Sequence, residues 1–116
     1  MSAATLASRR CQAVAPAATP EDIARMLPML PGWAVRDGKL TRAFAFKDHY
    51  ETLAFVNALA WVSHTEDHHP ELTVTYNRCV VRYDTHSVNA GKGGLSDNDF
   101  ICAARADAIY EQRAKA

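Results

Sequence analysis

The sequence predicts an α+β domain, in which a four-stranded antiparallel sheet has helices packed on one face, in the order α-β-β-α-β-β-α. Two observations support this prediction. Extended segments come in two pairs, each joined by a short turn, and one long helical pattern separates the pairs. Strands joined by a short turn pair as antiparallel neighbours, and the helices between and around them cover one face of the sheet.

The domain begins as a helix followed by a hairpin. Residues 19–22 (Thr-Pro-Glu-Asp) supply a capping residue, a proline suited to the first helical position and two acids that favour the positive end of the helix dipole. The pair Pro31-Gly32 ends this helix. Residues 33–36 are a short extended run, Asp37-Gly38 is a tight-turn signal, and residues 40–46 alternate as the second strand.

A long helix is expected next. Asp48 and Glu51 have the spacing of a capping box, and the apolar residues after them repeat with helical period. The helix is expected to end at about His68, because Pro70 disfavours the α conformation at His69. Its expected inward stripe consists of Leu53, Val56, Leu59 and Ala60, with Phe55 and Val62 flanking it.

A second hairpin and a last helix complete the domain. Residues 72–76 alternate as the third strand and residues 79–86 as the fourth, with positions 79, 81 and 83 on one face and His86 on the other. Residues 87–94 contain three glycines and are expected to form a loop, without the pattern of a phosphate-binding loop. Ser96 and Asp99 have capping spacing at the start of the last helix.

Composition restricts the class of protein. The 116 residues suffice for one domain, and the thirteen basic and thirteen acidic side chains cancel, which argues against direct binding of nucleic acid or an anionic membrane. No apolar run reaches about 18 residues, so no membrane span is predicted. Cys11, Cys79 and Cys102 fit reduced thiols in a cytoplasmic protein better than a disulfide framework.

The N-terminal residues differ from the rest in composition. Residues 1–19 are rich in Ala, Ser and Arg and contain no acid. Transit peptides share this composition, but the apolar region of a secretory signal is missing. We therefore expect a disordered tail at residues 1–19 and a single domain at residues 20–116, and we expect the open face and edges of its sheet to favour self-association.

Three histidines are expected to meet where the long helix ends. His68 and His69 follow two carboxylates and precede Pro70, and His86 ends the hairpin that comes next. The pKa of histidine in model peptides is about 6.5, so a group of imidazoles can donate and accept protons at neutral pH. Position and period alone leave two interpretations equally open, a shared site and unrelated polar side chains.

A metal site is the main alternative from the residues alone. His64, Asp67, His68 and His86 offer nitrogen and oxygen ligands suited to zinc, and histidines four residues apart share a helix face. Against it, the His-Glu-x-x-His order of zinc proteases is absent and no cysteine pair lies nearby. Cys79 falls inside a strand and is interpreted as core packing and not as a nucleophile.

Several motifs together resemble one known family. They are Asp67-His68-His69-Pro70-Glu71, Tyr76-Asn77-Arg78, Thr85-His86, Gly94-Leu95-Ser96-x-x-Asp99, Gly32-Trp33 and Phe44-x-Phe46-Lys47-Asp48. This set resembles the pterin-4a-carbinolamine dehydratases (4a-hydroxytetrahydrobiopterin dehydratases) from about Pro20 to the C-terminus. The resemblance implies a four-stranded antiparallel sheet with helices on one side, assembled as a homodimer or homotetramer. The implied reaction removes water from a 4a-hydroxytetrahydropterin and gives the quinonoid dihydropterin.

The resemblance also implies roles for individual residues. His68 and His86 are expected to act as the acid and base, and His69, grouped with them as catalytic, mainly to hold the substrate. The expected substrate-binding residues are His69, Pro70, Thr85, Trp33 and Asp99. Backbone groups near Thr85 are expected at the pyrimidinone edge, and Asp99 fits a capping role equally well. No cofactor is implied, and the implied partners are the pterin, further copies of the chain and, functionally, an aromatic amino-acid hydroxylase whose spent tetrahydrobiopterin is recycled.

Two departures and one alternative function accompany the resemblance. His64 stands where many members carry a glutamate, and the loop at residues 87–93 is longer than usual. Some members of the family act as protein-binding modules, as a dimerisation cofactor of a transcription factor or as an assembly factor for an enzyme. A scaffold freed from catalysis has no reason to keep all three histidines, so their presence favours the enzyme.

Overall fold

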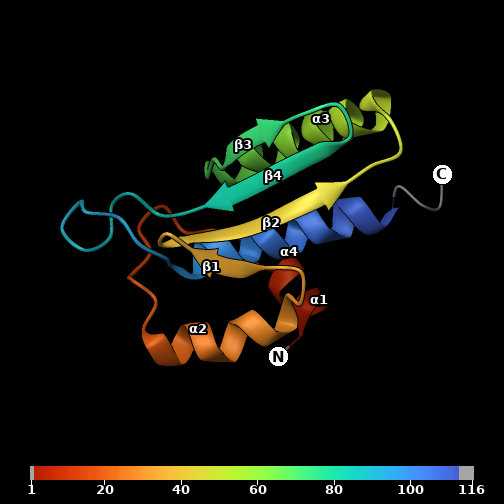
Figure 1. Cartoon of the computed structure of the whole chain (residues 1–116). Coiled ribbons are helices and arrows are strands. Elements are labelled where there is room, and N and C mark those ends of the chain that lie inside the picture. Colours follow the sequence, from red (N-terminus) through yellow and green to blue (C-terminus); the bar gives the residue numbers. More distant parts are fainter. Residues whose placement is uncertain (1, 113–116) are drawn as a thin grey trace.

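The computed structural model describes residues 2–112 and has the α+β architecture predicted from the sequence (Figure 1). Each expected element is present in the expected order, and one further short helix precedes them. The helices are α1 (Ala3–Ala7), α2 (Pro20–Met26) with the 3-10 turn η1 (Leu27–Met29), α3 (His49–Glu66) and α4 (Asp97–Gln112). The strands are β1 (Ala34–Arg36), β2 (Lys39–Ala45), β3 (Glu71–Val74) and β4 (Arg78–Tyr83).

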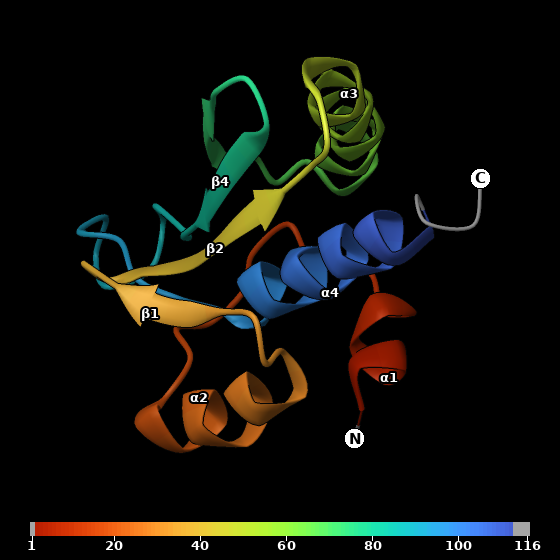
Figure 2. The same ribbon diagram turned by 45° about the vertical axis from the view of Figure 1, so that its right-hand side comes forward.

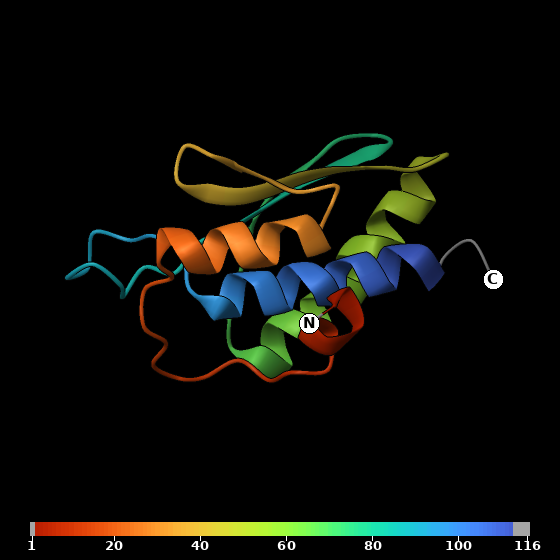
Figure 3. The ribbon, with the colours of Figure 1, turned by 90° about the horizontal axis from the view of Figure 1, so that it is seen from below.

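The strands form one sheet in the order β1-β2-β4-β3, and every neighbouring pair is antiparallel. Both predicted hairpins are therefore present, and β2 and β4 pair across the centre of the sheet. Helices α2, α3 and α4 lie on one face, which confirms the predicted layering (Figures 2 and 3). Within residues 2–112, none of the helices has both the length and the apolar character needed to cross a membrane.

The core lies between the sheet and the helices. Three side chains of β4, Cys79, Val81 and Tyr83, point into it and are fully buried, as their alternation predicts. Phe44 of β2 packs against the ring of Phe55 of α3, with 4.7 Å between ring centroids. This core fixes the end of α3 relative to β4, and the histidines of interest lie at those two ends.

The buried face of α3 is rotated about the helix axis relative to the predicted stripe, toward the side that carries Phe55 and Val62. Of the four residues in that stripe only Leu59 is fully buried, and Leu53 is 43% exposed. The buried side chains of α3 are those of Thr52, Phe55, Leu59, Val62, Ser63 and Glu66. Apolar residues occupy several sides of this helix, so hydrophobicity alone does not single out the inward face.

The predicted disordered tail is corrected by the structure, in which residues 2–19 fold against the domain. Helix α1 packs on α4, and Leu6 is fully buried in the core. Further along, the N–H of Ala18 donates to the carbonyl of Leu95 at 2.7 Å. The composition of the segment, which has no acidic residues, suggested disorder. In the structure, acidic residues from distant parts of the chain bind it, for example Asp97, whose Oδ2 lies 3.1 Å from Nη2 of Arg9.

Candidate active site

A cavity of about 510 Å³ lies where α3 and β4 end. Its walls come from separate parts of the chain: residues 11–13 and Ala15, residues 65–69, residues 84–87, and Asn98 of α4. His68, His69 and His86, three of the five histidines, therefore line a single cavity. A volume of this size, within the range of about 300–1,000 Å³ typical of ligand sites, suits a small molecule.

The end of α3 sends His68 and His69 in different directions. Asp67 caps the helix in the left-handed conformation (φ 50°, ψ 45°), and its N–H and that of His68 both donate to the carbonyl of Ser63. Aspartate adopts this conformation more readily than most residues, and Pro70 then prevents the helix from resuming. The turn leaves His68 largely covered and His69 exposed.

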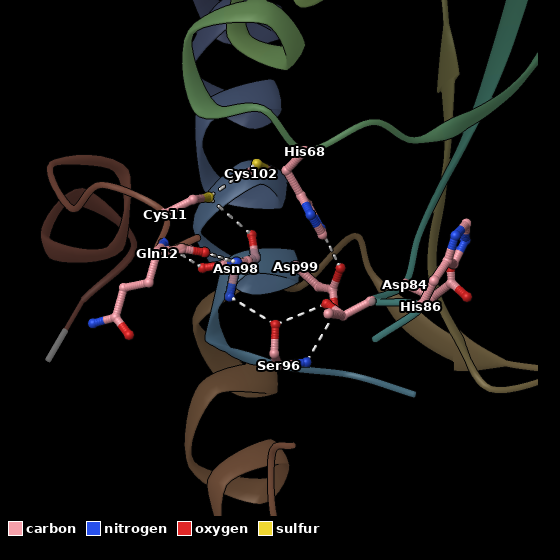
Figure 4. Close-up of polar contacts among 10 residues, drawn as sticks. Cys11, Gln12, His68, Asp84, His86, Ser96, Asn98, Asp99 and Cys102 are labelled. Atoms are coloured by element: carbon pink, nitrogen blue, oxygen red, sulfur yellow. Dashed lines mark hydrogen bonds and ion pairs between the residues drawn. The ribbon is translucent and has the colours of Figure 1, made fainter. Parts of the chain in front are cut away.

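His68 is held by a buried carboxylate. Its Nε2 lies 2.6 Å from Oδ1 of Asp99, whose side chain is fully buried, while 11% of the His68 side chain is exposed (Figure 4). The imidazole also stacks on the ring of Tyr83, with 5.9 Å between centroids and 9° between planes. The ring of His68 is thus fixed on two sides, and its Nδ1 has no hydrogen-bond partner within residues 2–112.

Asp99 is itself fixed by three donors from the chain. Its Oδ2 accepts from the hydroxyl of Thr85 and from the N–H of Ser96, both at 2.9 Å, while its Oδ1 accepts from His68. Asp99 therefore caps the start of α4 and orients His68 at the same time. Because Asp99 is fully buried and does not line the cavity, the structure gives it a positioning role in place of the expected contact with substrate.

The surroundings of His68 favour its protonated form. Burial by itself lowers the pKa of His68, but the hydrogen bond to Asp99 and the negative charge of that carboxylate outweigh burial, so the pKa is raised above its usual value. A larger fraction of His68 is therefore imidazolium at neutral pH. With Nε2–H directed to Asp99, the proton available for transfer is the one on Nδ1.

The other two histidines lie at the open side of the cavity. The side chain of His86 is 86% exposed, and its Nε2 lies 3.2 Å from Oδ1 of Asp84 (Figure 4). His69 is exposed and borders both this cavity and a neighbouring hollow of about 320 Å³. One imidazole is therefore anchored inside the cavity, and two are accessible at its rim.

Two expected substrate contacts lie elsewhere in the structure. Trp33 is part of the core, where its Nε1–H donates to Asp107 at 2.9 Å and its ring packs on Phe44, so it does not cover this cavity. Pro70 lines the neighbouring hollow and not the cavity. Trp33 was misplaced because its indole N–H finds a carboxylate 74 residues away in the chain, which spacing does not reveal.

Thr85 does line the cavity, as expected, but its hydroxyl and its backbone N–H are already engaged. The hydroxyl donates to Asp99, and the backbone N–H donates to the carbonyl of Gly94 at 2.7 Å. The backbone N–H is therefore not free to bind a pyrimidinone edge. Of the longer loop at residues 87–93, only Ser87 reaches the cavity wall.

The four residues of the metal hypothesis are not brought together. His64 lines the neighbouring hollow, whereas Asp67, His68 and His86 line the main cavity. Within residues 2–112, no group of three or more His, Cys, Asp or Glu side chains is arranged to hold a metal ion. His68 is also committed to Asp99 through Nε2.

Several wall residues were given no role from the sequence, among them Cys11, Glu66 and Asn98. Glu66 had a detectable signal, because it lies seven residues after Leu59 and four after Val62, on the buried side of α3. No sequence signal pointed to Cys11, because it lies within residues 1–19, which were expected to be disordered. Cys79, by contrast, is buried in β4, where burial raises its pKa to about 11, in agreement with a packing role.

Comparisons with known proteins point to one family. The family model described as pterin 4 alpha carbinolamine dehydratase matches residues 16–109. A protein of Bdellovibrio bacteriovorus named "Putative pterin-4-alpha-carbinolamine dehydratase" is 53% identical over 109 residues, 94% of this chain and 91% of that protein. A protein of the same name from Stenotrophomonas maltophilia is 58% identical over 92 residues, 78% of this chain and 76% of its own.

A solved structure shares the fold. The crystal structure described as a transcriptional coactivator/pterin dehydratase from Brucella melitensis matches with a TM-score of 0.73 at 33% sequence identity. The match covers 81% of this chain and 98% of that one. Both activities in that description concern the Brucella protein, and they supply two functions to weigh for the present chain.

Proposed function

This chain belongs to the pterin 4 alpha carbinolamine dehydratase family, and we propose that it removes water from a 4a-hydroxytetrahydropterin to give the quinonoid dihydropterin. The observation that carries the proposal is the convergence of His68, His69 and His86 on one cavity, with His68 hydrogen-bonded to the buried carboxylate of Asp99. The reaction breaks the C4a–O bond, with one proton delivered to the leaving hydroxyl and one taken from N5, and this cavity holds groups that can carry out both proton transfers.

His68 is the general acid in this proposal. The hydroxyl on C4a leaves as water once it is protonated, and the raised pKa of His68 provides an imidazolium to protonate it near neutral pH. Asp99 holds the ring through Nε2 and so leaves the Nδ1–H available for the ligand. A positioned acid or base of this kind is typically worth about 10²–10⁴-fold in rate.

His86 is the base that takes the proton from N5, which completes the imine. Its neutral ring can accept a proton and pass it to solvent, because the side chain is 86% exposed and lies at the rim. Asp84, whose Oδ1 lies 3.2 Å from Nε2 of His86, orients this ring. His69, which is exposed and lines the same cavity, binds the substrate without itself exchanging protons.

A second candidate function is a protein-binding module, and the exposed apolar side chains of α3 favour it. Tyr50 and Trp61 are 82% and 67% exposed, which is unusual for aromatic side chains without a partner. The Brucella relative is described as a transcriptional coactivator as well as a dehydratase. This helix face is separate from the histidine cavity, so the two functions are compatible.

The dehydration rate tests the proposal directly. The protein is first treated with a metal chelator and desalted. The carbinolamine is then generated in place by an aromatic amino-acid hydroxylase, and dehydration is followed by ultraviolet absorbance. We expect the wild type to exceed the spontaneous rate, and His68→Ala and His86→Ala to lose most of that excess. His49→Ala is the matched control, because His49 is exposed and stacks on Tyr76 outside the cavity.

Each outcome separates one interpretation from another. A wild type that never exceeds the spontaneous rate contradicts the dehydratase proposal and directs attention to the α3 surface. Activity abolished by the chelator contradicts a mechanism of histidine acid/base catalysis alone. An equal loss in His49→Ala and His68→Ala shows that the histidine cavity is not the site.

A further inference from the structure

The N-terminal segment forms one wall of the histidine cavity. We call residues 10–15 the strap. Within it, Cys11, Gln12, Ala13 and Ala15 line the cavity, on the side away from β4. The strap precedes residue 16, where the match to the family model begins, so family membership gives it no role. Figure 3 shows this segment crossing beneath the end of α3 on its way from α1 to α2.

Glu66 at the end of α3 holds the beginning of the strap. Its Oε1 accepts from the backbone N–H of Cys11 and its Oε2 from Nε of Arg10, both at 2.7 Å. Burial alone raises the pKa of Glu66, but the N–H of Cys11 and the charges of Arg105 and Arg10 outweigh it, and the pKa is lowered. Glu66 is therefore a carboxylate at neutral pH, and its buried oxygens depend on the strap for hydrogen bonds.

Asn98 of α4 forms hydrogen bonds with both backbone groups of Gln12. Its Oδ1 accepts from the N–H of Gln12 at 3.0 Å, and its Nδ2 donates to the carbonyl of Gln12 at 2.9 Å (Figure 4). Arg105 donates to the carbonyl of Arg9, just before the strap. If the strap left, these largely buried polar groups would lose their hydrogen-bond partners, which is unfavourable for buried donors and acceptors. The strap is thus built into the cavity wall.

The strap presents only small side chains to the cavity at its centre. Ala13 and Ala15 line the cavity, whereas Val14 between them is 84% exposed and does not. Residues 13 and 14 form a bend, which leaves Val14 in solvent between the two alanines. The methyl groups of Ala13 and Ala15 therefore bound this part of the cavity, and a larger side chain at position 13 would take up space that a ligand can now use.

We propose that the strap selects the substituent on C6 of the pterin ring by its size. This inference rests on the proposed function. In that reaction C4a and N5 face His68 and His86, and C6 is bonded directly to N5. A C6 substituent therefore leaves the ring close to the histidines and extends toward a wall that they do not form. Among those walls, the strap is the one that presents alanine side chains. The two alanines leave room there for a branched, hydroxylated side chain.

Substituted strap residues and two substrates test the inference. The value of kcat/KM is measured for Ala13→Leu and Val14→Leu on 4a-hydroxytetrahydropterins that carry either a methyl or a dihydroxypropyl group at C6. We expect Ala13→Leu to lose about tenfold or more on the dihydroxypropyl substrate and to keep most of its activity on the methyl substrate, since filling a pocket by one or more methylenes costs about 10–200-fold. Val14→Leu, which points to solvent, is expected to match the wild type on both.

The results also distinguish this inference from the proposed function. An unchanged substrate ratio in Ala13→Leu, or an equal change in Val14→Leu, overturns the role of the strap while dehydration stands. A wild type without activity on either substrate overturns the proposed function itself. Glu66→Gln provides a second test, in which we expect faster amide hydrogen exchange at Cys11 and Gln12 and a changed substrate ratio. Unchanged exchange at both amides contradicts the holding role of Glu66.

Discussion

The pairing of His68 with Asp99 is the residue-scale feature on which the chemistry depends. The sequence indicated that His68 belongs to a site, because it precedes a proline at the end of a helix and belongs to a recognisable motif. It did not indicate the partner, which is 31 residues away. Capping spacing did predict that Asp99 supports the start of α4, and the structure shows that one carboxylate serves both purposes.

The pKa of His68 is expected to fall in Asp99→Asn. The carboxylate stabilises the imidazolium by a hydrogen bond and by charge, and an amide supplies no charge. The measurement is an NMR titration of the histidine ring signals. Asp37→Asn, in the β1–β2 turn, is the control and should leave the pKa of His68 unchanged. An unchanged pKa of His68 in Asp99→Asn would contradict the assignment.

The same shift predicts a dependence of stability on pH. Because the pKa of His68 is higher in the folded than in the unfolded chain, the stabilisation is fully present below the unfolded-state value. It is lost as pH rises through the folded-state pKa. Urea unfolding of the wild type should therefore show this contribution weakening as the pH rises past the folded-state value, and Asp99→Asn should show less of this dependence.

At the scale of elements, local signals were sufficient for the hairpins and insufficient for the N-terminal segment. Asp37-Gly38 predicted a turn because the turn itself demands such residues, and both residues do have positive φ. The N-terminal segment is ordered by Glu66 and Asn98, which lie more than 50 residues away in the chain. The composition of the segment describes only its own residues, and not the distant residues that hydrogen-bond to it in the folded chain.

Cys11 and Cys102 are expected to form a disulfide under oxidation. Their sulfur atoms are 3.5 Å apart, and the hydrogen bond with Cys102 is the main cause of the lowered pKa of the Cys11 thiol. With oxidised glutathione, the two thiols would lose two protons and two electrons, which reduce the glutathione disulfide to two thiols. Mass spectrometry should find Cys11 joined to Cys102 and Cys79 unmodified, because Cys79 is buried with a raised pKa.

Cys11→Ser is the matched control for this oxidation. It removes one partner and should leave no internal disulfide after the same treatment. Modification of Cys79 ahead of the Cys11–Cys102 pair, or no link between them after prolonged oxidation, would contradict the geometry described here.

At the scale of the whole molecule, the pattern of hydrophobic residues predicted the layers but not every side chain. Alternation in β4 assigned Cys79, Val81 and Tyr83 to the core correctly. Trp33 was expected near the ligand, and its actual place in the core follows from Asp107 and Phe44, which no local pattern connects to it. The site is likewise a product of the complete fold, since four separated segments line the cavity.

Self-association remains a prediction, and the exposed aromatic side chains of α3 indicate which surface it would use. Trp61 and Tyr50 on this helix would be covered in a dimer or tetramer that uses α3. We expect Trp61→Glu to shift the protein to smaller species in sedimentation velocity. Val14→Glu, which charges an exposed apolar position on the strap and not on α3, should not. A monomeric wild type at micromolar concentrations, or an equal shift in both variants, would contradict a role for α3.

The pH dependence of kcat/KM for dehydration, in the wild type and in Asp99→Asn, tests the central claim most directly. If His68 donates the proton that releases water, kcat/KM falls as pH rises through the pKa of His68. In Asp99→Asn this fall should begin at lower pH, because the pKa of His68 is no longer raised. A wild type that is no faster than the spontaneous reaction would contradict the claim that His68, held by Asp99, donates this proton. Two pH profiles that fall at the same pH would contradict it as well.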